Sequence, residues 1–135
     1  MEEVEERLRI FATKVFARFA GKERLDDKRL CEAITRAERG SVDADLGGNL
    51  IKQRVARPGG GRSGGYRTVI AYRASRRSVF LYGFAKNERD NIDDGELNDL
   101  KKLARQFLNY TEEQIATAVK QTELKEVFCD DQEKE

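Results

Sequence analysis

The residues best suited to chemistry in this sequence lie in one arginine-rich segment, residues 52–89. The segment holds ten basic residues and a single acid, Glu88, so it carries a net charge of +9, whereas the rest of the chain carries −8. Eight of the ten cations are arginine, whose planar guanidinium contacts phosphate through two parallel hydrogen bonds. Charge segregated in this way indicates a polyanionic partner, with nucleic acid as the first candidate.

Five of these cations have a spacing that suits phosphoryl chemistry. Lys52 and Arg54 are two residues apart, hence on one face of a strand, and Arg67 begins the next strand. Lys86 and Arg89 follow the last strand of the segment. Arginines stabilise charge that develops on phosphate oxygens, and a lysine can take the proton of a ribose 2′-hydroxyl. We predict a catalytic group of these five residues that needs no metal or cofactor, because the attacking hydroxyl belongs to the substrate. A solvated sheet face is the alternative for each cation.

Other residues of the segment are candidates for binding nucleic acid: Arg57, Arg62, Arg73, Tyr66 and Asn87. Tyr66 could stack on a base, although tyrosines at alternate strand positions more often pack in a core. Arg62 lies in the loop PGGGRSGG, residues 58–65. This loop lacks the GxxxxGK[ST] pattern of a phosphate-binding loop, so we expect a flexible connection between two strands.

Composition narrows the possible classes of site. The chain has no histidine, which removes the commonest general base and metal ligand. Cys31 is expected to be a small core residue and Cys129 has no evident partner; two cysteines cannot build a zinc cluster. The longest apolar run, residues 79–85, is far shorter than the roughly 20 residues of a membrane span. The first ten residues lack the apolar segment of a secretory signal, so we expect a cytoplasmic protein with reduced cysteines.

The apolar periodicity predicts the elements that position these residues. Strands are predicted at 7–13, 50–57, 66–74 and 78–84, helices at 14–20, 27–39 and 95–108, and a further helix after Thr111. The last three strands should form an antiparallel meander, residues 41–48 a loop, and 124–129 a short extended segment. The expected N-caps are Asp26 or Asp27 and Asp93 or Asp94.

This order of elements predicts an α+β domain, a small antiparallel sheet with helices packed on one side. At 135 residues the chain is expected to form one domain over 1–135. Residues 1–6 should be a flexible N-terminal extension and residues 130–135 a flexible, solvated tail.

Several longer stretches, taken together and in order, resemble the RelE-type toxins of the RelE/ParE toxin–antitoxin superfamily, of the HigB/RelE-like kind. They are F-x-x-K-x-F-A-R-F-A (11–20), D-A-D-L-G-G (43–48), I-K-Q-R-V-A-R-P-G (51–59), S-G-G-Y-R-T (63–68) and Y-G-F-A-K-N-E-R-D-N-I (82–92). The resemblance implies a microbial-ribonuclease-like fold. It also implies cleavage of mRNA, in many members only in the ribosomal A site, and growth arrest relieved by a cognate antitoxin protein.

The resemblance also implies where the family's catalytic residues fall. The strand pair matches Lys52 and Arg54, the arginine of the G-Y-R motif matches Arg67, and the basic segment after the last strand matches 86–89. In the best-known RelE pattern an arginine follows the lysine of that segment, where this chain has Asn87. Asp93 lies near the place of a family tyrosine, so Lys86 or Arg89 would assist the leaving group.

Two other functions stay open at this point. ParE-type toxins share the fold but inhibit DNA gyrase without cutting RNA, and a plain RNA- or DNA-binding module would need no catalytic group. The favoured interpretation is a ribosome-dependent mRNA endoribonuclease, with the ribosome, mRNA and an antitoxin as partners.

Overall fold

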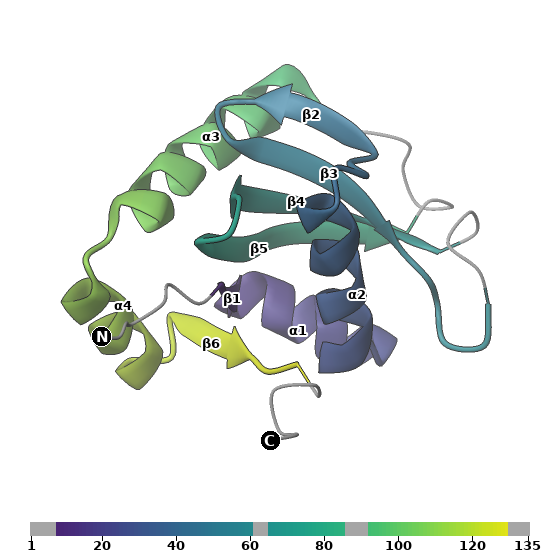
Figure 1. The fold of residues 1–135 in the computed structure, drawn as a ribbon, viewed down its shortest axis with the longest axis horizontal. Helices are drawn as coiled ribbons and strands as arrows, with labels where there is room; N and C mark the ends of the chain where they lie inside the picture. Colours follow the sequence, from purple (N-terminus) through teal and green to yellow (C-terminus); the bar gives the residue numbers. More distant parts are fainter. Residues whose placement is uncertain (1–7, 61–64, 86–91, 130–135) are drawn as a thin grey trace.

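The computed structural model describes residues 8–60, 65–85 and 92–129, which form a sheet of six strands with four helices (Figure 1). The elements, in chain order, are β1 (Arg9–Thr13), α1 (Lys14–Glu23), α2 (Asp27–Glu38), β2 (Ala44–Gly47), β3 (Leu50–Val55), β4 (Tyr66–Arg73), β5 (Arg77–Ala85), α3 (Asp94–Asn109), α4 (Glu112–Lys120) and β6 (Leu124–Val127). The predicted α+β class is confirmed, and so are the predicted helices and the four main strands, with small shifts at their ends. No helix in the described ranges is long and apolar enough to cross a membrane.

The sheet is mixed, with the strand order β2-β3-β4-β5-β1-β6. The meander β3-β4-β5 is antiparallel, as predicted. β1, however, pairs in parallel with β5 and antiparallel with β6, so the sheet is not purely antiparallel. Parallel neighbours need a long connection, which here comprises α1, α2 and the strands β2 to β4. The first strand of the chain therefore lies inside the sheet, between two strands that come much later.

The loop predicted at 41–48 was wrong in part, because β2 lies within it. Ala44 and Asp45 pair with Lys52 and Ile51 of β3, and a turn follows in which Gly47, Gly48 and Asn49 all have positive φ. The aspartates and glycines indicated a turn, but pairing with β3 supplies hydrogen bonds that local propensity does not register. β2 is consequently a short edge strand.

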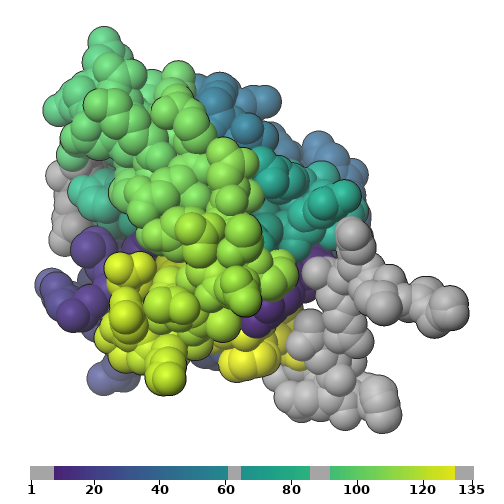
Figure 2. All heavy atoms as spheres, turned by 90° about the vertical axis from the view of Figure 1, so that its left-hand side faces the viewer, coloured from purple at the N-terminus to yellow at the C-terminus, as the bar shows by residue number. Residues whose placement is uncertain are grey.

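The core has two apolar clusters, separated by the alternation of side chains along the strands. Ile10 and Ala12 of β1 belong to a cluster that includes apolar residues of α1 and α2. Phe11, between them, belongs to a second cluster that includes apolar residues of α3 and α4. Seen from the left-hand side of Figure 1, α3 and α4 together form a continuous outer surface (Figure 2). Helices α1 and α2 thus cover apolar residues on one face of the sheet, and α3 and α4 cover apolar residues on the other. Parts of the sheet outside these clusters carry polar side chains.

The helix starts follow the predicted capping residues. The side chain of Asp26 accepts a hydrogen bond from Arg29 N at the start of α2. Asp93 caps α3 in a reciprocal box with Glu96, and Thr111 caps α4 in the same way. Side-chain acceptors of this kind satisfy N–H groups that have no partner inside the helix.

The prediction that the cysteines are unpaired was wrong, because Cys31 and Cys129 form a disulfide with a Cα–Cα distance of 5.8 Å. The two residues are 98 positions apart in the sequence. β6 nevertheless pairs with β1, and Phe128 N, directly after β6, donates to Asp27 Oδ2 of α2 at 3.0 Å. The end of β6 therefore returns to α2, which a reading of local sequence could not show.

Candidate functional site

Three of the five predicted catalytic residues lie together on one face of the sheet. Along β3 the side chains alternate, so that Leu50, Lys52 and Arg54 share the face on which Leu50 joins the α3 and α4 cluster. On β4, Arg67 lies opposite Arg54. All three cations are partly exposed. The structure thus brings Lys52, Arg54 and Arg67 into one cationic group, which we call the β3–β4 cation cluster.

The Cα atoms of Arg54 and Arg67 belong to the more closely spaced of the two kinds of antiparallel cross-strand pair. Arg54 N donates to Asp43 Oδ2 at 2.7 Å, and the Arg54 carbonyl accepts from Arg36 Nη2. Both backbone groups of Arg54 therefore point away from β4, which makes Arg54 and Arg67 a non-hydrogen-bonded pair with a Cα separation of about 4.5 Å. Like charges directly opposite each other destabilise a sheet, and an anion placed between them removes that repulsion.

The third member of the cluster, Arg67, differs from Arg54 in its hydrogen bonding. Its Nη1 atom is buried and has no hydrogen-bond partner among the residues that the structure describes. A buried donor left unpaired costs about 1–3 kcal/mol, and more when the group is charged. Phosphate oxygens are the acceptors that a guanidinium fork binds best. Such a donor has the chemistry to bind a phosphate oxygen.

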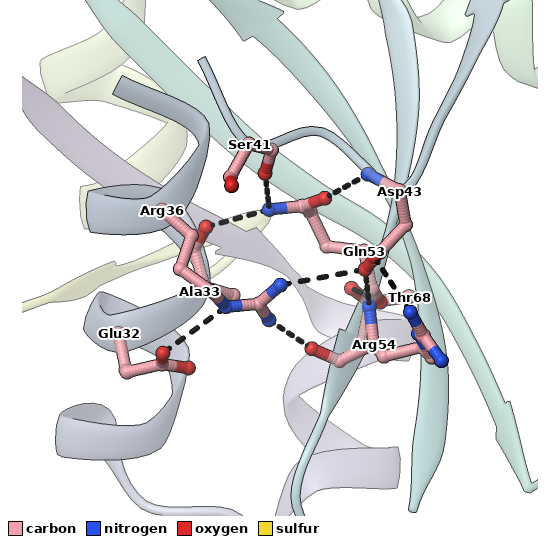
Figure 3. A network of polar contacts seen from close by, with 8 residues as sticks. All are labelled: Glu32, Ala33, Arg36, Ser41, Asp43, Gln53, Arg54 and Thr68. Carbon is pink, nitrogen blue, oxygen red and sulfur yellow. Dashed lines mark hydrogen bonds and ion pairs between the residues drawn. The ribbon is translucent and has the colours of Figure 1, made fainter. Parts of the chain in front are cut away.

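Arg54 is held by a polar network that ties α2 to β3 (Figure 3). Asp43 Oδ1 accepts from Arg54 Nη2 at 3.2 Å, and Asp43 Oδ2 lies 3.4 Å from Arg36 Nη1. Arg36 Nε in turn donates to Glu32 Oε2 at 3.0 Å. Burial acts to raise the pKa of Asp43, but hydrogen bonds from Arg54 and the charges of Arg54 and Arg36 outweigh it, so the pKa lies below its ordinary value. Asp43 is thus a carboxylate in this network.

Gln53, which separates Lys52 from Arg54 along β3, anchors the same network from the opposite face of the sheet. Its side chain is fully buried; it donates to Ala33 O at 2.9 Å and accepts from Asp43 N at 2.7 Å. A buried amide with its hydrogen bonds made fixes the strand against α2 and the segment before β2. The backbone that carries the cations is thereby held in place.

Tyr66 and Arg57 lie away from the cation cluster. Tyr66 is buried on the opposite face of β4, its hydroxyl donates to Glu23 Oε1 at 2.8 Å, and its ring packs edge-on against Phe19. The guanidinium of Arg57 lies 5.1 Å from the centroid of the Tyr66 ring. Tyr66 therefore acts in the core, and Arg57 is an exposed cation beyond the end of β3.

Arg73 lies at the far end of β4, where it contacts a helix terminus. Its guanidinium donates to Leu108 O at 2.9 Å and to Asn109 Oδ1 at 3.5 Å, at the C-terminus of α3. The neighbouring Arg77 donates to Phe107 O and Tyr110 O. Cations at a helix C-terminus donate hydrogen bonds to its unpaired carbonyls and interact favourably with the helix dipole. Part of the +9 charge of the segment thus serves the fold.

Four predicted site residues lie outside the described residues: Arg62, Lys86, Asn87 and Arg89. Residue 92 resumes the described chain, and Asp93 then caps α3, as its reciprocal bonds with Glu96 show. A small hollow lies between β5 and the start of α3, lined by Tyr82, Glu96, Asp99 and Leu100. Tyr82 pairs with Val69, which pairs with Lys52, so the hollow lies on the same side of the meander as the cation cluster.

Comparison with known families decides what this arrangement belongs to. The family model described as RelE toxin of the RelE / RelB toxin-antitoxin system matches residues 8–127. The chain belongs to the RelE toxin family. A comparison with curated proteins finds no match. As a RelE toxin, the chain is the toxin of a toxin–antitoxin system, and the family implies a cognate antitoxin as its partner.

Sequence reasoning missed the residues that hold the cations of this RelE toxin. Asp43 stood in one of the motifs that resemble the family, yet its place opposite β3 depends on the pairing of β2. Arg36 and Glu32 are four residues apart on α2, and this spacing indicates an ion pair. It does not indicate that the Arg36 side chain also reaches the backbone of β3. The sequence did hold one signal for Gln53. Because side chains alternate along a strand, two cations at 52 and 54 on the outer face place the residue between them on the inner face.

Proposed function

We propose that this RelE toxin is a cytoplasmic, ribosome-dependent endoribonuclease that cleaves mRNA, blocks translation and arrests growth. The observation that carries the proposal is the cation cluster of Lys52, Arg54 and Arg67, in which Arg67 Nη1 is buried with no partner among the described residues. Three cations on two adjacent strands suit one phosphate group of an RNA backbone.

The proposed reaction is transfer of the phosphate to the neighbouring ribose. The 2′-oxygen attacks the adjacent phosphorus, the bond from phosphorus to the 5′-oxygen breaks, and the products are a 2′,3′-cyclic phosphate and a 5′-hydroxyl. Lys52 takes the 2′-hydroxyl proton or clamps the phosphate, while Arg54 and Arg67 stabilise the charge that develops on the phosphate oxygens. Lys86 or Arg89 assists the departing 5′-oxygen. No metal or cofactor takes part, because the nucleophile belongs to the substrate.

The surrounding cations of the segment contribute to binding in this proposal. Arg57 is exposed beyond β3. With Arg62 and Asn87 it would contact the RNA or ribosomal backbone, a sequence-independent contribution that weakens with salt. Arg73 and Tyr66 have structural partners in the fold and are left out of the proposed interface.

Neutralisation by the cognate antitoxin follows from the same charge. A protein that presents acidic and apolar surface to the segment of +9 would cover the cation cluster and compete with RNA. The antitoxin would then block cleavage without altering the fold of the toxin.

The test is cleavage of a defined mRNA on ribosomes with an empty A site, with the RNA ends mapped. The wild-type protein should cut within the A-site codon, and Arg67→Ala should lower the rate by about 100- to 1,000-fold, the effect of losing one transition-state donor. The matched control is Arg76→Ala, which removes the same charge from the exposed β4–β5 turn and should stay within about threefold of wild type.

Three results would count against the proposal. Intact mRNA beside a folded wild-type protein overturns ribonuclease activity. DNA damage signalling without loss of mRNA points instead to inhibition of gyrase. Normal cleavage by Arg67→Ala removes Arg67 from the site.

A further inference from the structure

We infer that Asp43 and Arg36 are positioning residues that hold Arg54 in the cation cluster in the orientation needed for phosphate. The inference rests on the proposed function and deepens it, because neither residue belongs to the predicted catalytic group. Three features of the described structure support it: the end of β2, the double contact of Asp43 with Arg54, and the anchoring of Arg36 on α2.

The first feature is that β2 stops short of Arg54. Ala44, the first residue of β2, pairs with Lys52, so no residue of β2 pairs with Arg54. Two side chains replace the missing strand: Asp43 Oδ2 accepts from Arg54 N at 2.7 Å, and Arg36 Nη2 donates to Arg54 O. The backbone of Arg54 is therefore fixed by residues outside the sheet.

The second feature is that one carboxylate holds both ends of Arg54. While Oδ2 of Asp43 accepts from the backbone N, Oδ1 accepts from Nη2 at 3.2 Å. This double contact selects a side-chain conformation that keeps Nη2 near the backbone N of the same residue, and it leaves the other guanidinium N–H groups for a ligand. The Arg54 side chain is 43% exposed, so those groups are within reach of an incoming phosphate.

The third feature is that Arg36 and Asp43, which hold Arg54, are themselves fixed by several contacts. The Arg36 side chain is only 13% exposed, and it contacts Glu32, Asp43 and the Arg54 carbonyl at once. Asp43 is held again at its backbone N–H by the buried Gln53. A side chain ordered before the ligand arrives loses little entropy on binding, and it presents its charge in one direction.

The Asp43 carboxylate also moderates repulsion inside the cluster. Arg54 and Arg67 lie opposite each other, so an uncompensated Arg54 would swing away from Arg67 towards solvent. Asp43 offsets part of the Arg54 charge and keeps its guanidinium near β3. Loss of Asp43 should therefore weaken catalysis through Arg54 rather than through the fold as a whole.

A double-mutant cycle in the ribosome cleavage assay tests this inference. Asp43→Asn conserves volume but removes the charge and sets an NH₂ group against the donors of Arg54. It should lower the single-turnover cleavage rate by about 10- to 100-fold, the cost of misplacing a reacting group by roughly 1 Å. In an Arg54→Ala background the same change should alter the rate by less than about twofold, because the residue that Asp43 positions is gone.

Matched variants separate positioning from a general structural effect. Asp45, two residues after Asp43 and within β2, accepts from Gly47 N and does not contact Arg54. Asp45→Asn removes this carboxylate and should leave the rate within about twofold of wild type. Arg36→Lys keeps the charge but cannot bridge Asp43 and the Arg54 carbonyl together. It should give a smaller loss than Asp43→Asn while thermal unfolding shows both variants folded.

The outcomes are distinguishable from failure of the proposed function. Wild-type cleavage with an unchanged Asp43→Asn variant, or an equal loss from Asp43→Asn in both backgrounds, overturns the positioning role alone. A wild-type protein that cleaves nothing, or a fully active Arg54→Ala variant, overturns the proposed site, and this inference with it.

Discussion

Reduction of the Cys31–Cys129 disulfide should lower the stability of the protein by a large and calculable amount. The bond joins α2 to the residues that follow β6 and closes a loop across 98 positions of the chain. A cross-link stabilises a protein chiefly by restricting the unfolded chain, and the effect grows with the length of the closed loop. This pair therefore spans most of the 135-residue chain.

The magnitude follows from loop length and chain length. A closed loop of this size corresponds to about 4.7 kcal/mol at 25 °C by the chain-entropy relation, and disulfides commonly deliver about 2–4 kcal/mol. We expect a loss of about 3–5 kcal/mol. An unfolding entropy of about 2.1 cal/mol/K per residue converts this loss into a fall in Tm of about 11–18 °C for 135 residues.

The assay is thermal unfolding followed by circular dichroism, with thiols counted in denaturant beforehand. The control is Cys129→Ser, which breaks the bond at the partly buried cysteine and leaves Cys31 as a small core thiol. Oxidised wild type should show no free thiol and the highest Tm. Wild type that has been reduced in denaturant and refolded with dithiothreitol should match Cys129→Ser, and that variant should not respond to the reductant.

Two results would refute the reasoning. Two free thiols in wild type purified without reductant would show that the pairing does not form. A confirmed disulfide whose loss moves Tm by less than about 3 °C would show that the unfolded chain is not restricted in the way that the loop length requires.

Two further predictions concern the effects of Gly83→Ala and Gly21→Ala on stability, and the pH dependence of the stability that Asp43 contributes. Gly83→Ala should destabilise the protein by about 1–3 kcal/mol, because the added Cβ would lie 2.5 Å from the Phe19 ring, and urea unfolding measures it. Gly21→Ala in α1 meets no atom within 4 Å and should instead stabilise by up to about 1 kcal/mol; the same sign for both would contradict the packing argument. Folding holds the pKa of Asp43 below its ordinary value of 3.8, so its contribution is complete above that value and is lost as the pH falls through the folded pKa. The gap in urea midpoint between wild type and Asp43→Asn should therefore narrow below about pH 4, and a constant gap would be evidence against a paired carboxylate.

The parts of the fold that depend on local pattern were predictable. The alternation along residues 66–73 placed Arg67 on one face and Tyr66 on the other, and the structure shows the same separation into two core clusters. The repeat of leucines and Phe107 predicted α3, and polar residues at the helix starts predicted the caps. Such features are set by neighbours within a few residues.

Features that depend on distant pairing were not predictable from one sequence. β2 has turn-forming residues and becomes a strand because β3 lies beside it. The disulfide depends on β6 returning to β1 and α2. In the site, Lys52 and Arg54 share a face through the period of a strand alone, whereas Asp43 and Arg36 reach Arg54 from separate elements. Sequence spacing therefore indicates the cations but not the residues that hold them.

The position of β1 inside the sheet has a consequence for the order in which the toxin can assemble during its synthesis. β1 is the first strand made, yet both of its neighbours, β5 and β6, come later, and β6 ends at residue 127. A nascent chain can form the meander β3-β4-β5 from contacts close in sequence, but the β6 side of β1 stays open until residues 124–127 have emerged. The sheet should therefore be completed only after residue 127 has left the ribosome, and until then the unpaired edge of β1 is available to any strand or chaperone that binds open edges.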